Sequence, residues 1–304
     1  MTEKQESDCP IFEAAKERLR RCIRAAAKPG CPVSATAVPG LTAVVRETAG
    51  SCECSVYKPC IVAVAMGGKQ AVIGEKAYDY GAGDVFVSAM DVPVIWRVTK
   101  ASQDAPFMAA SLELDAELVR ELLPRLPAAV PSDEVPSVAT IGACCPEMLD
   151  AFSRMLSLGE HPEDIPVLYP LIKREIHWRV LTGPWGESLK RLFTADSQTN
   201  RIERAVAWLR DNFKEPLSVD ELADRVHMAP STFYRHFKTV MNLSPLQYHK
   251  LLRLHEARRL MIVKQMDAAT AAYSVGYVSP TQFSREYKRL FGASPKKSVA
   301  AMRS

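Results

Sequence analysis

The sequence predicts an α+β protein, in which a β-rich N-terminal domain with flanking helices precedes an all-helical C-terminal domain. Between residues 32 and 114, short runs rich in β-branched and aromatic residues alternate with Gly, Pro and Asp. Regularly spaced short strands of this kind favour a small barrel or jelly roll. Between residues 201 and 292 the apolar spacing is helical almost throughout. Because 304 residues suffice for two cores, we expect one domain at residues 1–195 and another at residues 196–304.

The composition is that of an ordinary globular protein, with 47% apolar and 24% charged residues. The chain contains no run of about 18 apolar residues and no signal-peptide pattern at its start, so we expect a cytoplasmic protein without membrane contact. The charge is unevenly distributed: residues 196–304 hold 18 Lys and Arg against 10 Asp and Glu, whereas the rest holds 21 against 25. A basic C-terminal third indicates a polyanionic partner, although a solvated surface would show the same charges.

The N-terminal domain begins with an amphipathic pattern at residues 12–28, which predicts a helix that ends at Pro29-Gly30. Five β-rich runs follow, at residues 41–49, 56–68, 69–80, 84–90 and 92–101. Gly67-Gly68 predicts a hairpin, and the Gly-Ala-Gly-Asp sequence at residues 81–84 predicts another turn.

Helical patterns return after Asp115, at residues 115–126, 146–158 and 164–183. The third of these is apolar on more than one face, so it must be covered by its own domain or by a partner subunit. We therefore expect a homodimer. The polar segment at residues 195–200 is the best candidate for a linker.

The C-terminal domain contains one motif twice, fifty residues apart. Phe233 and Phe283 each begin the pattern F-x-R-x-[FY]-K-x5-S-P. Such a repeat indicates one helical unit built twice, with Arg and Lys at matched places. Two equal basic helices at a fixed distance fit two neighbouring turns of double-stranded DNA.

Each unit reads as a helix, a turn and a second helix. In the first unit we expect Ser218 and Ser231 to cap the two helices, and the second helix to bury Phe233, Phe237 and Val240. Its outer face would then present Ser231, Thr232, Tyr234, Arg235 and Lys238. In the second unit Ser279 caps the helix that carries Phe283, Tyr287 and Phe291 and presents Pro280, Thr281, Gln282, Arg285 and Lys288. A rigid helix at residues 245–263 would connect the two units.

Arginine suits base contacts, because its guanidinium group can donate two hydrogen bonds to one guanine, whereas lysine mostly holds phosphate. We therefore expect Arg235 and Arg285 to contact bases, with Tyr234, Thr281 and Gln282 assisting them. The phosphate contacts that we expect come from Lys238, Lys288 and Arg258.

Residues 201–304 closely resemble the tandem helix-turn-helix domain of the AraC/XylS family of bacterial transcription regulators. The resemblance rests on the run Arg253–Leu260, the Gly276-Tyr277 turn and the closing Ser294-Pro295. Tyr287 stands where the family usually has Phe, a change that should still pack.

The N-terminal body resembles the sensor domain of one branch of this family. The matching segments are residues 56–60, 67–69, Gly74, 80–84, 112–115, 174–177 and 181–184. The resemblance implies a cupin-like barrel with helices that pair two subunits. It also implies a DNA-binding transcription regulator controlled by a small-molecule effector, with RNA polymerase as a further partner if it is an activator.

An enzymatic barrel is the first alternative, because many cupins hold a metal through histidines. No histidine precedes His161 in this sequence, so we expect no metal, no cofactor and no catalytic residues. His177 and Glu175 fit a core or partner-facing role better than catalysis. The candidate effector-binding residues, each of which could equally belong to the core, are Tyr57, Met66, Tyr80, Phe86 and Trp96.

A thiol switch is the second alternative, because Cys52, Cys54 and Cys60 lie close together. They can be plain free thiols, a redox or electrophile sensor activated by a cation such as Lys58, or part of a metal site with Cys144-Cys145. Their C-x-C-x5-C spacing departs from the usual zinc pattern. A DNA-repair protein with alkyl-accepting cysteines is a more remote alternative, and the C-x2-C or C-x3-C pair that would support it is missing from the sequence.

Overall fold

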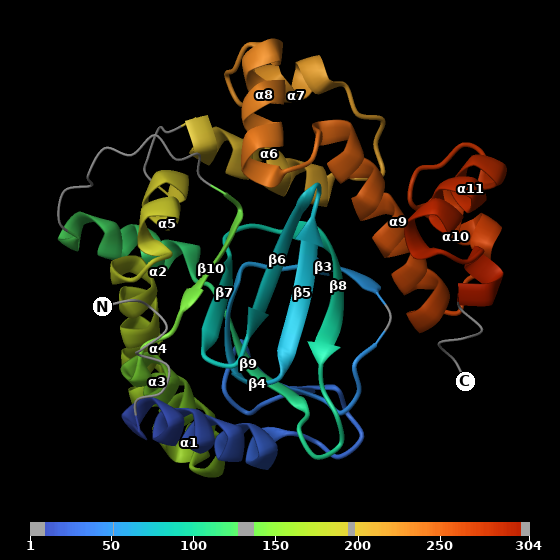
Figure 1. Ribbon diagram of the computed structural model, residues 1–304. Coiled ribbons are helices and arrows are strands. Elements are labelled where there is room, and N and C mark those ends of the chain that lie inside the picture. The colour runs from blue at the N-terminus through green and yellow to red at the C-terminus, as the bar shows by residue number, and fades with distance from the viewer. Residues whose placement is uncertain (1–9, 51, 127–136, 194–197, 299–304) are drawn as a thin grey trace.

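The computed structural model describes residues 10–50, 52–126, 137–193 and 198–298. Two antiparallel sheets face each other in the centre of the molecule, with helices at one side and the C-terminal helices above and beside them (Figure 1). The first sheet has the strand order β1 (Val33–Ala35), β2 (Leu41–Arg46), β9 (Phe107–Glu113), β4 (Cys60–Met66), β7 (Asp84–Ser88) and β10 (Ala139–Ala143). The second has the order β3 (Glu53–Tyr57), β8 (Val92–Lys100), β5 (Gly68–Ile73) and β6 (Lys76–Gly81).

The expected β-rich domain is confirmed, and its two sheets form a jelly-roll-like sandwich. Among the described strands no pairing joins the two sheets into one closed barrel. The inward residues come from strand alternation: β9, for example, turns Phe107, Ala109 and Ser111 toward the interior cavity described below. Strand β10 was not expected from the sequence, because its five residues stand alone between two helical patterns and the β-branched pair Thr140-Ile141 is too short to predict a strand.

The predicted hairpin at Gly67-Gly68 is wrong. Strands β4 and β5 flank this turn but belong to different sheets, so the turn carries the chain from one sheet to the other. Gly67 has φ +80°, and a Cβ there would lie 2.6 Å from the carbonyl oxygen of Lys100, so glycine is required by close packing. The hairpin lies one strand later, where β5 pairs with β6 around Gly74. The turn expected at residues 81–84 is present between β6 and β7.

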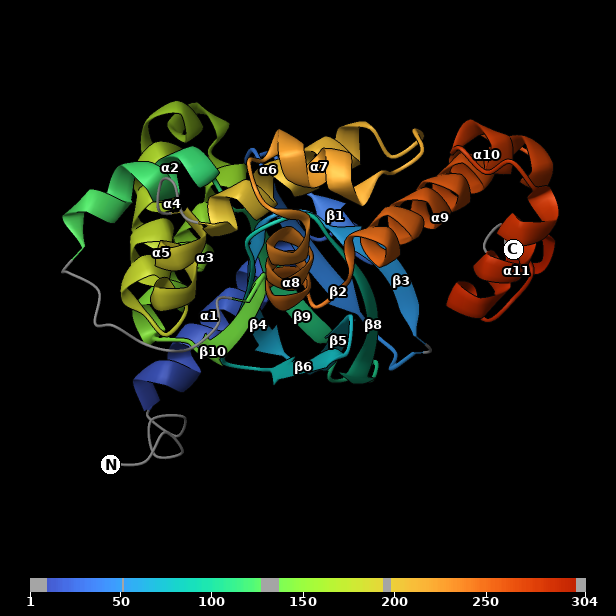
Figure 2. The ribbon, with the colours of Figure 1, turned by 90° about the horizontal axis from the view of Figure 1, so that it is seen from above.

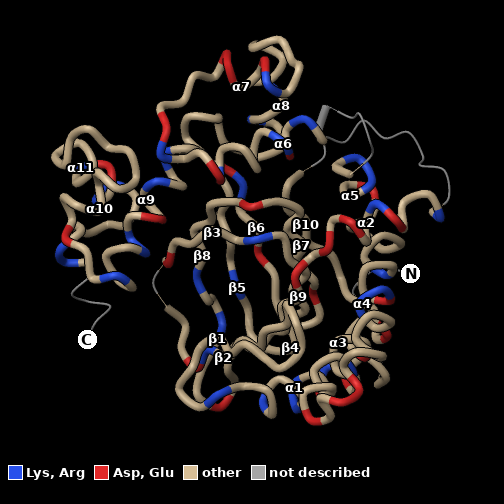
Figure 3. The backbone as a smooth tube through the Cα atoms, turned by 180° about the vertical axis from the view of Figure 1, so that it is seen from behind, with Lys and Arg blue, Asp and Glu red and all other residues tan. Residues whose placement is uncertain are grey.

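Five helices complete the N-terminal part, with bounds α1 (Pro10–Ala26), α2 (Ala116–Leu122), α3 (Pro146–Ser157), α4 (Ile165–Thr182) and α5 (Gly186–Phe193). Short 3-10 turns lie at Leu123–Arg125, Leu158–Glu160 and Pro162–Asp164. Helix α1 packs on α3 and on strands of the first sheet, and it carries both acidic and basic residues, the charged residues after Glu17 being all basic (Figure 3).

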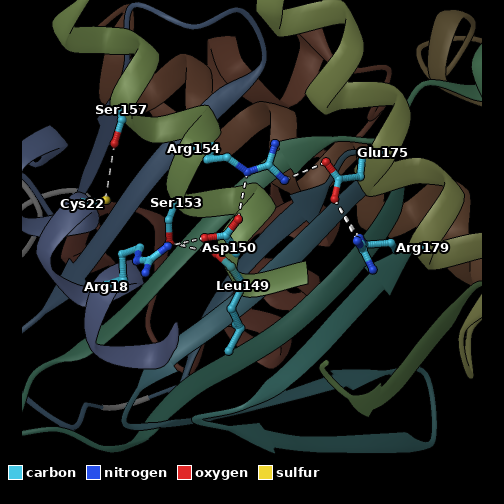
Figure 4. Close-up of polar contacts among 9 residues, drawn as sticks. All are labelled: Arg18, Cys22, Leu149, Asp150, Ser153, Arg154, Ser157, Glu175 and Arg179. Carbon is cyan, nitrogen blue, oxygen red and sulfur yellow. Dashed lines mark hydrogen bonds and ion pairs between the residues drawn. The ribbon is translucent and has the colours of Figure 1, made fainter. Parts of the chain in front are cut away.

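A chain of ion pairs connects α1, α3 and α4 at the surface (Figure 4). Asp150 accepts from Arg18 and, at 2.9 Å, from Arg154; Glu175 accepts from Arg154 at 2.7 Å and from Arg179 at 2.9 Å. Glu175 is therefore occupied by two arginines and lies half-buried at the surface, so the core role that was one of the two expected for it is wrong, and the partner-facing role stays a prediction.

His177 lies in the core and is only 1% exposed. Its Nε2 atom accepts a hydrogen bond from the backbone N–H of Asp115 at 2.9 Å, and its Nδ1 atom lies 2.8 Å from the carbonyl oxygen of Lys173. Burial lowers the pKa of His177 to about 4, because desolvation disfavours the charged ring. The neutral imidazole joins α4 to the start of α2, and the core role expected from the sequence is confirmed.

The C-terminal helices are α6 (Gln198–Asp211), α7 (Val219–Arg225), α8 (Pro230–Met241), α9 (Pro245–Val263), α10 (Ala268–Ser274) and α11 (Pro280–Phe291). Helix α9 has the bounds expected for the connecting helix, and it spans from the α6–α8 group to the α10–α11 pair (Figure 2). Ser244 begins it with a reciprocal capping box to Gln247. The expected linker falls partly on residues 194–197, which lie outside the described residues, and α6 already includes residues 198–200.

The two units differ in how they join the rest of the molecule. The buried residues of α6, α7 and α8 are continuous with the core of the sheets, up to Leu252 in α9. The second unit has a separate core, formed by Leu254, Ala257, Leu260, Met261, Ala271, Ala272, Val275, Tyr277, Phe283 and Tyr287. The boundary between the two cores therefore lies within α9.

Polar contacts hold the first unit on the sheets. Asp91, beside β8, accepts from Arg210 of α6 at 2.9 Å, and its carbonyl oxygen accepts from the buried hydroxyl of Tyr248 at 2.8 Å. The backbone N–H of Val138 donates to the carbonyl oxygen of Val240, at the end of α8, at 3.0 Å. In the part of the chain that the structure describes, no helix is long and apolar enough to cross a membrane.

Candidate nucleic-acid interface and ligand cavity

Helix α8 separates an apolar face from a polar one. Phe233 and Phe237 are fully buried, and their rings lie 5.6 Å apart between centroids. The expected outer residues Ser231, Tyr234, Arg235 and Lys238 are exposed and Thr232 is half-buried. The expectation that Ser231 caps this helix is wrong: the cap position is Ala229, without a side-chain bond. Proline at position 230 has its φ angle fixed near the helical value, so the helix begins two residues earlier than expected.

Helix α11 repeats this design fifty residues later, with the same length of 12 residues. Ser279 caps it by accepting a hydrogen bond from the N–H of Gln282 at 3.3 Å, as expected. Phe283 and Tyr287 are fully buried. The outer residues Thr281, Gln282, Arg285 and Lys288 are exposed, and Pro280 is half-buried. Both helices thus present an Arg and a Lys three residues apart on an open face, the arrangement that contacts to bases and phosphates require.

Arg258 does not lie on this face. It projects from α9 toward the N-terminal domain, where Nη1 donates to the carbonyl oxygen of Cys54 at 3.4 Å and the guanidinium group lies 4.7 Å from the centroid of the Phe291 ring. The sequence could not reveal this position, because it depends on how α9 is placed against β3.

The sequence did not predict the role of Arg253, which lies on α9 five residues before Arg258. Its guanidinium group donates to the carbonyl oxygens of Phe213, Lys214 and Glu215, at 2.6 to 2.9 Å, and to that of Gly276 at 3.1 Å. The first three belong to the loop after α6, and the fourth belongs to the turn of the second unit. Arg253 therefore joins the two units, although their cores are separate.

A cavity of about 700 Å³ lies between the two sheets, a size typical of sites for small molecules. Of the five residues expected to bind an effector, Tyr57, Tyr80 and Trp96 line it, and Met66 and Phe86 do not. Phe86 is fully buried beneath it and stacks on Tyr80, with ring centroids 5.0 Å apart. Most of the remaining wall is apolar and comes from Val33, Val38, Leu41, Val44, Val56, Val62, Val98, Phe107 and Ala109.

Three basic residues line the cavity, and two of them, Lys69 on β5 and Arg46 on β2, were not identified from the sequence; the third is Lys58. Strand alternation alone would have placed Arg46 on the same face as Thr42 and Val44, but the face of Lys69 follows from the crossing at Gly67. The Lys69 ammonium lies 4.1 Å from the centroid of the Trp96 ring. Desolvation by burial lowers the pKa of Lys69 to about 8.

The three cysteines singled out in the sequence are not gathered into one site. Cys54 lies on β3 facing the second unit, with Sγ 3.9 Å from the carbonyl oxygen of Leu290, whereas Cys60 lines the cavity and Cys52 is exposed. Burial raises the pKa of the Cys54 thiol and raises that of Cys60 to about 12, which disfavours the reactive thiolate. Across the described ranges no cluster of three or more His, Cys, Asp or Glu could hold a metal ion.

Known protein families match both the N-terminal domain and the C-terminal helices of this chain. Residues 37–188, half of the chain, match the model of the AraC-type transcriptional regulator N-terminus, and residues 222–300 match that of a helix-turn-helix domain. The HTH-type transcriptional activator RhaS of Escherichia fergusonii is 34% identical over 106 residues, which cover 34% of this chain and 38% of RhaS. The sequence match therefore spans well under half of that relative.

Solved structures show a similar fold over most of the chain. An apo ToxT variant from Vibrio cholerae strain SCE256 covers 86% of this chain and 97% of its own, with a TM-score of 0.56 and 10% identity. Wild-type ToxT from the same strain, bound to an unsaturated fatty acid, covers 85% of this chain and 94% of its own, with a TM-score of 0.53 and 10% identity. With a family model matching half of its length, and with paired helix-turn-helix units behind a two-sheet domain, the chain belongs to the AraC family of transcriptional regulators.

Proposed function

We propose that this chain is a sequence-specific DNA-binding transcription regulator whose activity is controlled by a small molecule bound between the two sheets. The observation that carries the proposal is the pair α8 and α11. Both have 12 residues, both bury aromatic side chains on one face, and both present Arg and Lys on the other. The similarity to the transcriptional activator RhaS supports the same role.

In this proposal α8 and α11 enter two successive major grooves on one side of the DNA. Arg235 and Arg285 contact base edges, and Lys238 and Lys288 hold phosphates. Tyr234, Thr281 and Gln282 assist the base contacts. Arg258 reaches a phosphate only in a state in which its contact with the Cys54 carbonyl is released.

A helix-turn-helix regulator of this kind commonly binds as a dimer, and α4 offers a surface for pairing. Val167, Leu168 and Leu171 are 66%, 39% and 62% exposed and follow one another on the same side of α4. We propose that this apolar patch contacts a second copy of the chain. The protein then acts in the cytoplasm, has no enzymatic activity of its own, and contacts RNA polymerase if it is an activator.

The effector is proposed to occupy the 700 Å³ cavity. The ToxT neighbour, described as bound to an unsaturated fatty acid, supports a ligand in this part of the fold. The raised pKa values of Cys54 and Cys60 favour an effector over the thiol-switch alternative.

DNA binding to the protein's own upstream region tests the proposal. Fluorescence anisotropy would compare the wild type, a variant with both Arg235→Ala and Arg285→Ala, and the control Lys264→Ala at the exposed end of α9. We expect the double variant to lose specific binding and the control to keep it. Equal binding by all three would reject the assignment of α8 and α11. The same assay with a thiol oxidant, and with Cys52, Cys54 and Cys60 replaced by Ser, tests the alternative: an oxidant effect that the Ser variant abolishes would establish a thiol switch.

A further inference from the structure

Three hydrogen-bond donors meet in one wall of the cavity. They are the ammonium group of Lys69 on β5, Nε of Arg46 on β2 and the hydroxyl of Tyr57 on β3. Arg46 Nε and Tyr57 Oη are fully buried, and neither has a hydrogen-bond partner among the described residues. Since buried polar groups are nearly always hydrogen-bonded in native structures, two such atoms in one cavity wall need an explanation.

Lys69 is the third member of this group. Its ammonium is surrounded by aromatic rings, at 4.1 Å from the centroid of Trp96, 5.1 Å from that of Tyr57 and 6.0 Å from that of Phe107. Within the described part of the chain, no carboxylate oxygen lies within ion-pair distance of it. The rings stabilise a cation partially, but they do not provide the acceptor oxygens that a desolvated ammonium group lacks.

The acidic residues near this wall are already placed elsewhere. Glu53 Oε1 accepts from Arg46 Nη1 at 3.1 Å, which leaves the Nε of the same guanidinium group directed elsewhere. Glu113 is the one carboxylate among the described residues that line the cavity, and it is exposed. It ends β9, whereas Phe107, the residue of β9 whose ring lies 6.0 Å from the Lys69 ammonium, begins that strand. The wall therefore has an excess of positive charge and donors, and a ligand is the natural source of the missing acceptors.

The other walls determine the rest of the ligand. They are formed mostly by aliphatic side chains, among them Val38, Leu41, Val44, Val62 and Val98. Such walls favour an apolar body, because polar groups placed against them would lose their hydrogen bonds to water. We propose that the cavity binds an apolar carboxylic acid, whose carboxylate accepts hydrogen bonds from Lys69, Arg46 Nε and Tyr57 Oη. This inference rests on the proposed role of the cavity as the effector site and names the chemical class of the effector.

The test compares ligands that differ only in charge. Isothermal titration calorimetry would measure the binding of saturated straight-chain carboxylates from hexanoate to hexadecanoate and of the corresponding uncharged alcohols, with tryptophan fluorescence as a second readout of occupancy. We expect the best carboxylate to bind at least about tenfold more tightly than its alcohol, as a charge-assisted hydrogen bond provides. Equal affinities of acid and alcohol, or no binding of any carboxylate, would overturn the inference.

Two variants identify the residue responsible. Lys69→Met keeps most of the side-chain volume and removes the charge, so we expect it to lose the preference for the acid while it still binds the alcohol. Lys100→Met, at an exposed position on β8, is the matched control and should keep the preference. If Lys69→Met retains the full preference, the carboxylate is held elsewhere. DNA binding of each variant without ligand shows whether the proposed regulator function itself still stands.

Proton uptake provides a readout that a merely structural lysine would not change. The charged and titratable groups that line the cavity together with Lys69 are Arg46 on β2, Tyr57 on β3, Lys58 directly after β3, Cys60 on β4, Tyr80 on β6 and Glu113 on β9. Glu53 on β3 also acts on Lys69 through its charge. Burial raises the pKa values of Tyr57, Cys60 and Tyr80, so these three stay neutral near pH 8. A carboxylate beside Lys69 raises the pKa of the ammonium group from about 8. Half of the free Lys69 is already charged at a pH equal to its pKa, so binding at pH 8 should take up at most about half a proton, and affinity should fall as the pH rises above 8. Calorimetry in buffers of different ionisation enthalpy would detect this uptake, and its absence in the wild type would contradict the inference.

Discussion

Replacing Arg253 by Met removes the four hydrogen bonds that join the two helix-turn-helix units. A hydrogen bond from a charged donor contributes about 1.5–3 kcal/mol. Because the Arg253 side chain is only half-buried and water can replace part of what is lost, we expect a total of about 3 kcal/mol rather than the full sum. Arg253→Lys should recover little of this, since one ammonium group cannot reproduce the planar fork that reaches both loops.

Hydrogen–deuterium exchange of peptides from residues 267–291 measures the effect locally. A loss of about 3 kcal/mol corresponds to exchange faster by about 100-fold in the second unit. The first unit should change less, because its core is continuous with that of the sheets. Arg259→Met is the control: Arg259 is exposed and pairs within its own helix with Glu256, and such pairs contribute little. If Arg253→Met and Arg259→Met exchange alike, the carbonyl contacts of Arg253 do not stabilise the junction.

Three further predictions address the DNA contact, the buried histidine and the exposed helix face. Arg285→Ala should lose about 1–3 kcal/mol on the correct DNA site and relax its base preference; equal weakening on all sequences, measured by competition binding, would make Arg285 a phosphate contact. His177 has a folded pKa of about 4 below its unfolded value of about 6.5, so its contribution to stability is complete above pH 6.5 and is lost as the pH falls toward 4. Urea unfolding at pH 7 and pH 4.5 should therefore show a smaller loss for His177→Gln than for the wild type, by about 2–3 kcal/mol; parallel losses would contradict the burial argument. Leu171→Glu should convert the proposed homodimer into a monomer, as measured by light scattering. If the wild type is already monomeric, the proposal that the α4 patch pairs two subunits is wrong.

The sequence predicted best where the spacing within one segment is sufficient. The repeated motif located both outer faces correctly, because the burial of Phe233 and Phe283 follows from helical periodicity alone. The predicted caps Ser218 and Ser279 are also correct, because capping depends on neighbours three residues away. Ser231 failed because a preceding proline competes for the helix start, and the rigidity of proline outweighs the preference of serine for the cap.

The features that the sequence did not predict depend on how distant segments pair. Glycine at position 67 favours a tight turn in any fold. Whether that turn joins two paired strands or crosses between sheets depends on the partners of the flanking strands, and here β4 pairs with β9 whereas β5 pairs with β8. The same crossing brings Lys69 opposite Arg46, which is why neither was identified as a cavity residue. Arg258 was assigned to phosphate because its type suits that role, but the position of α9 against β3 is a long-range property of the fold.

The location of the core boundary within α9 has a practical consequence for dissecting the protein. A fragment cut at the polar segment before α6 would appear from the sequence to be a complete DNA-binding domain. In such a fragment the hydroxyl of Tyr248 would lose its acceptor, the carbonyl oxygen of Asp91. The carbonyl oxygen of Val240, at the end of α8, would also lose its hydrogen bond from the N–H of Val138. Such a fragment should tend to aggregate, and polar replacements on the uncovered side of the first unit would be needed to make it well behaved. Fusions that exchange sensor domains between relatives face the same difficulty, so a functional hybrid should carry matched first-unit residues together with its new sheets.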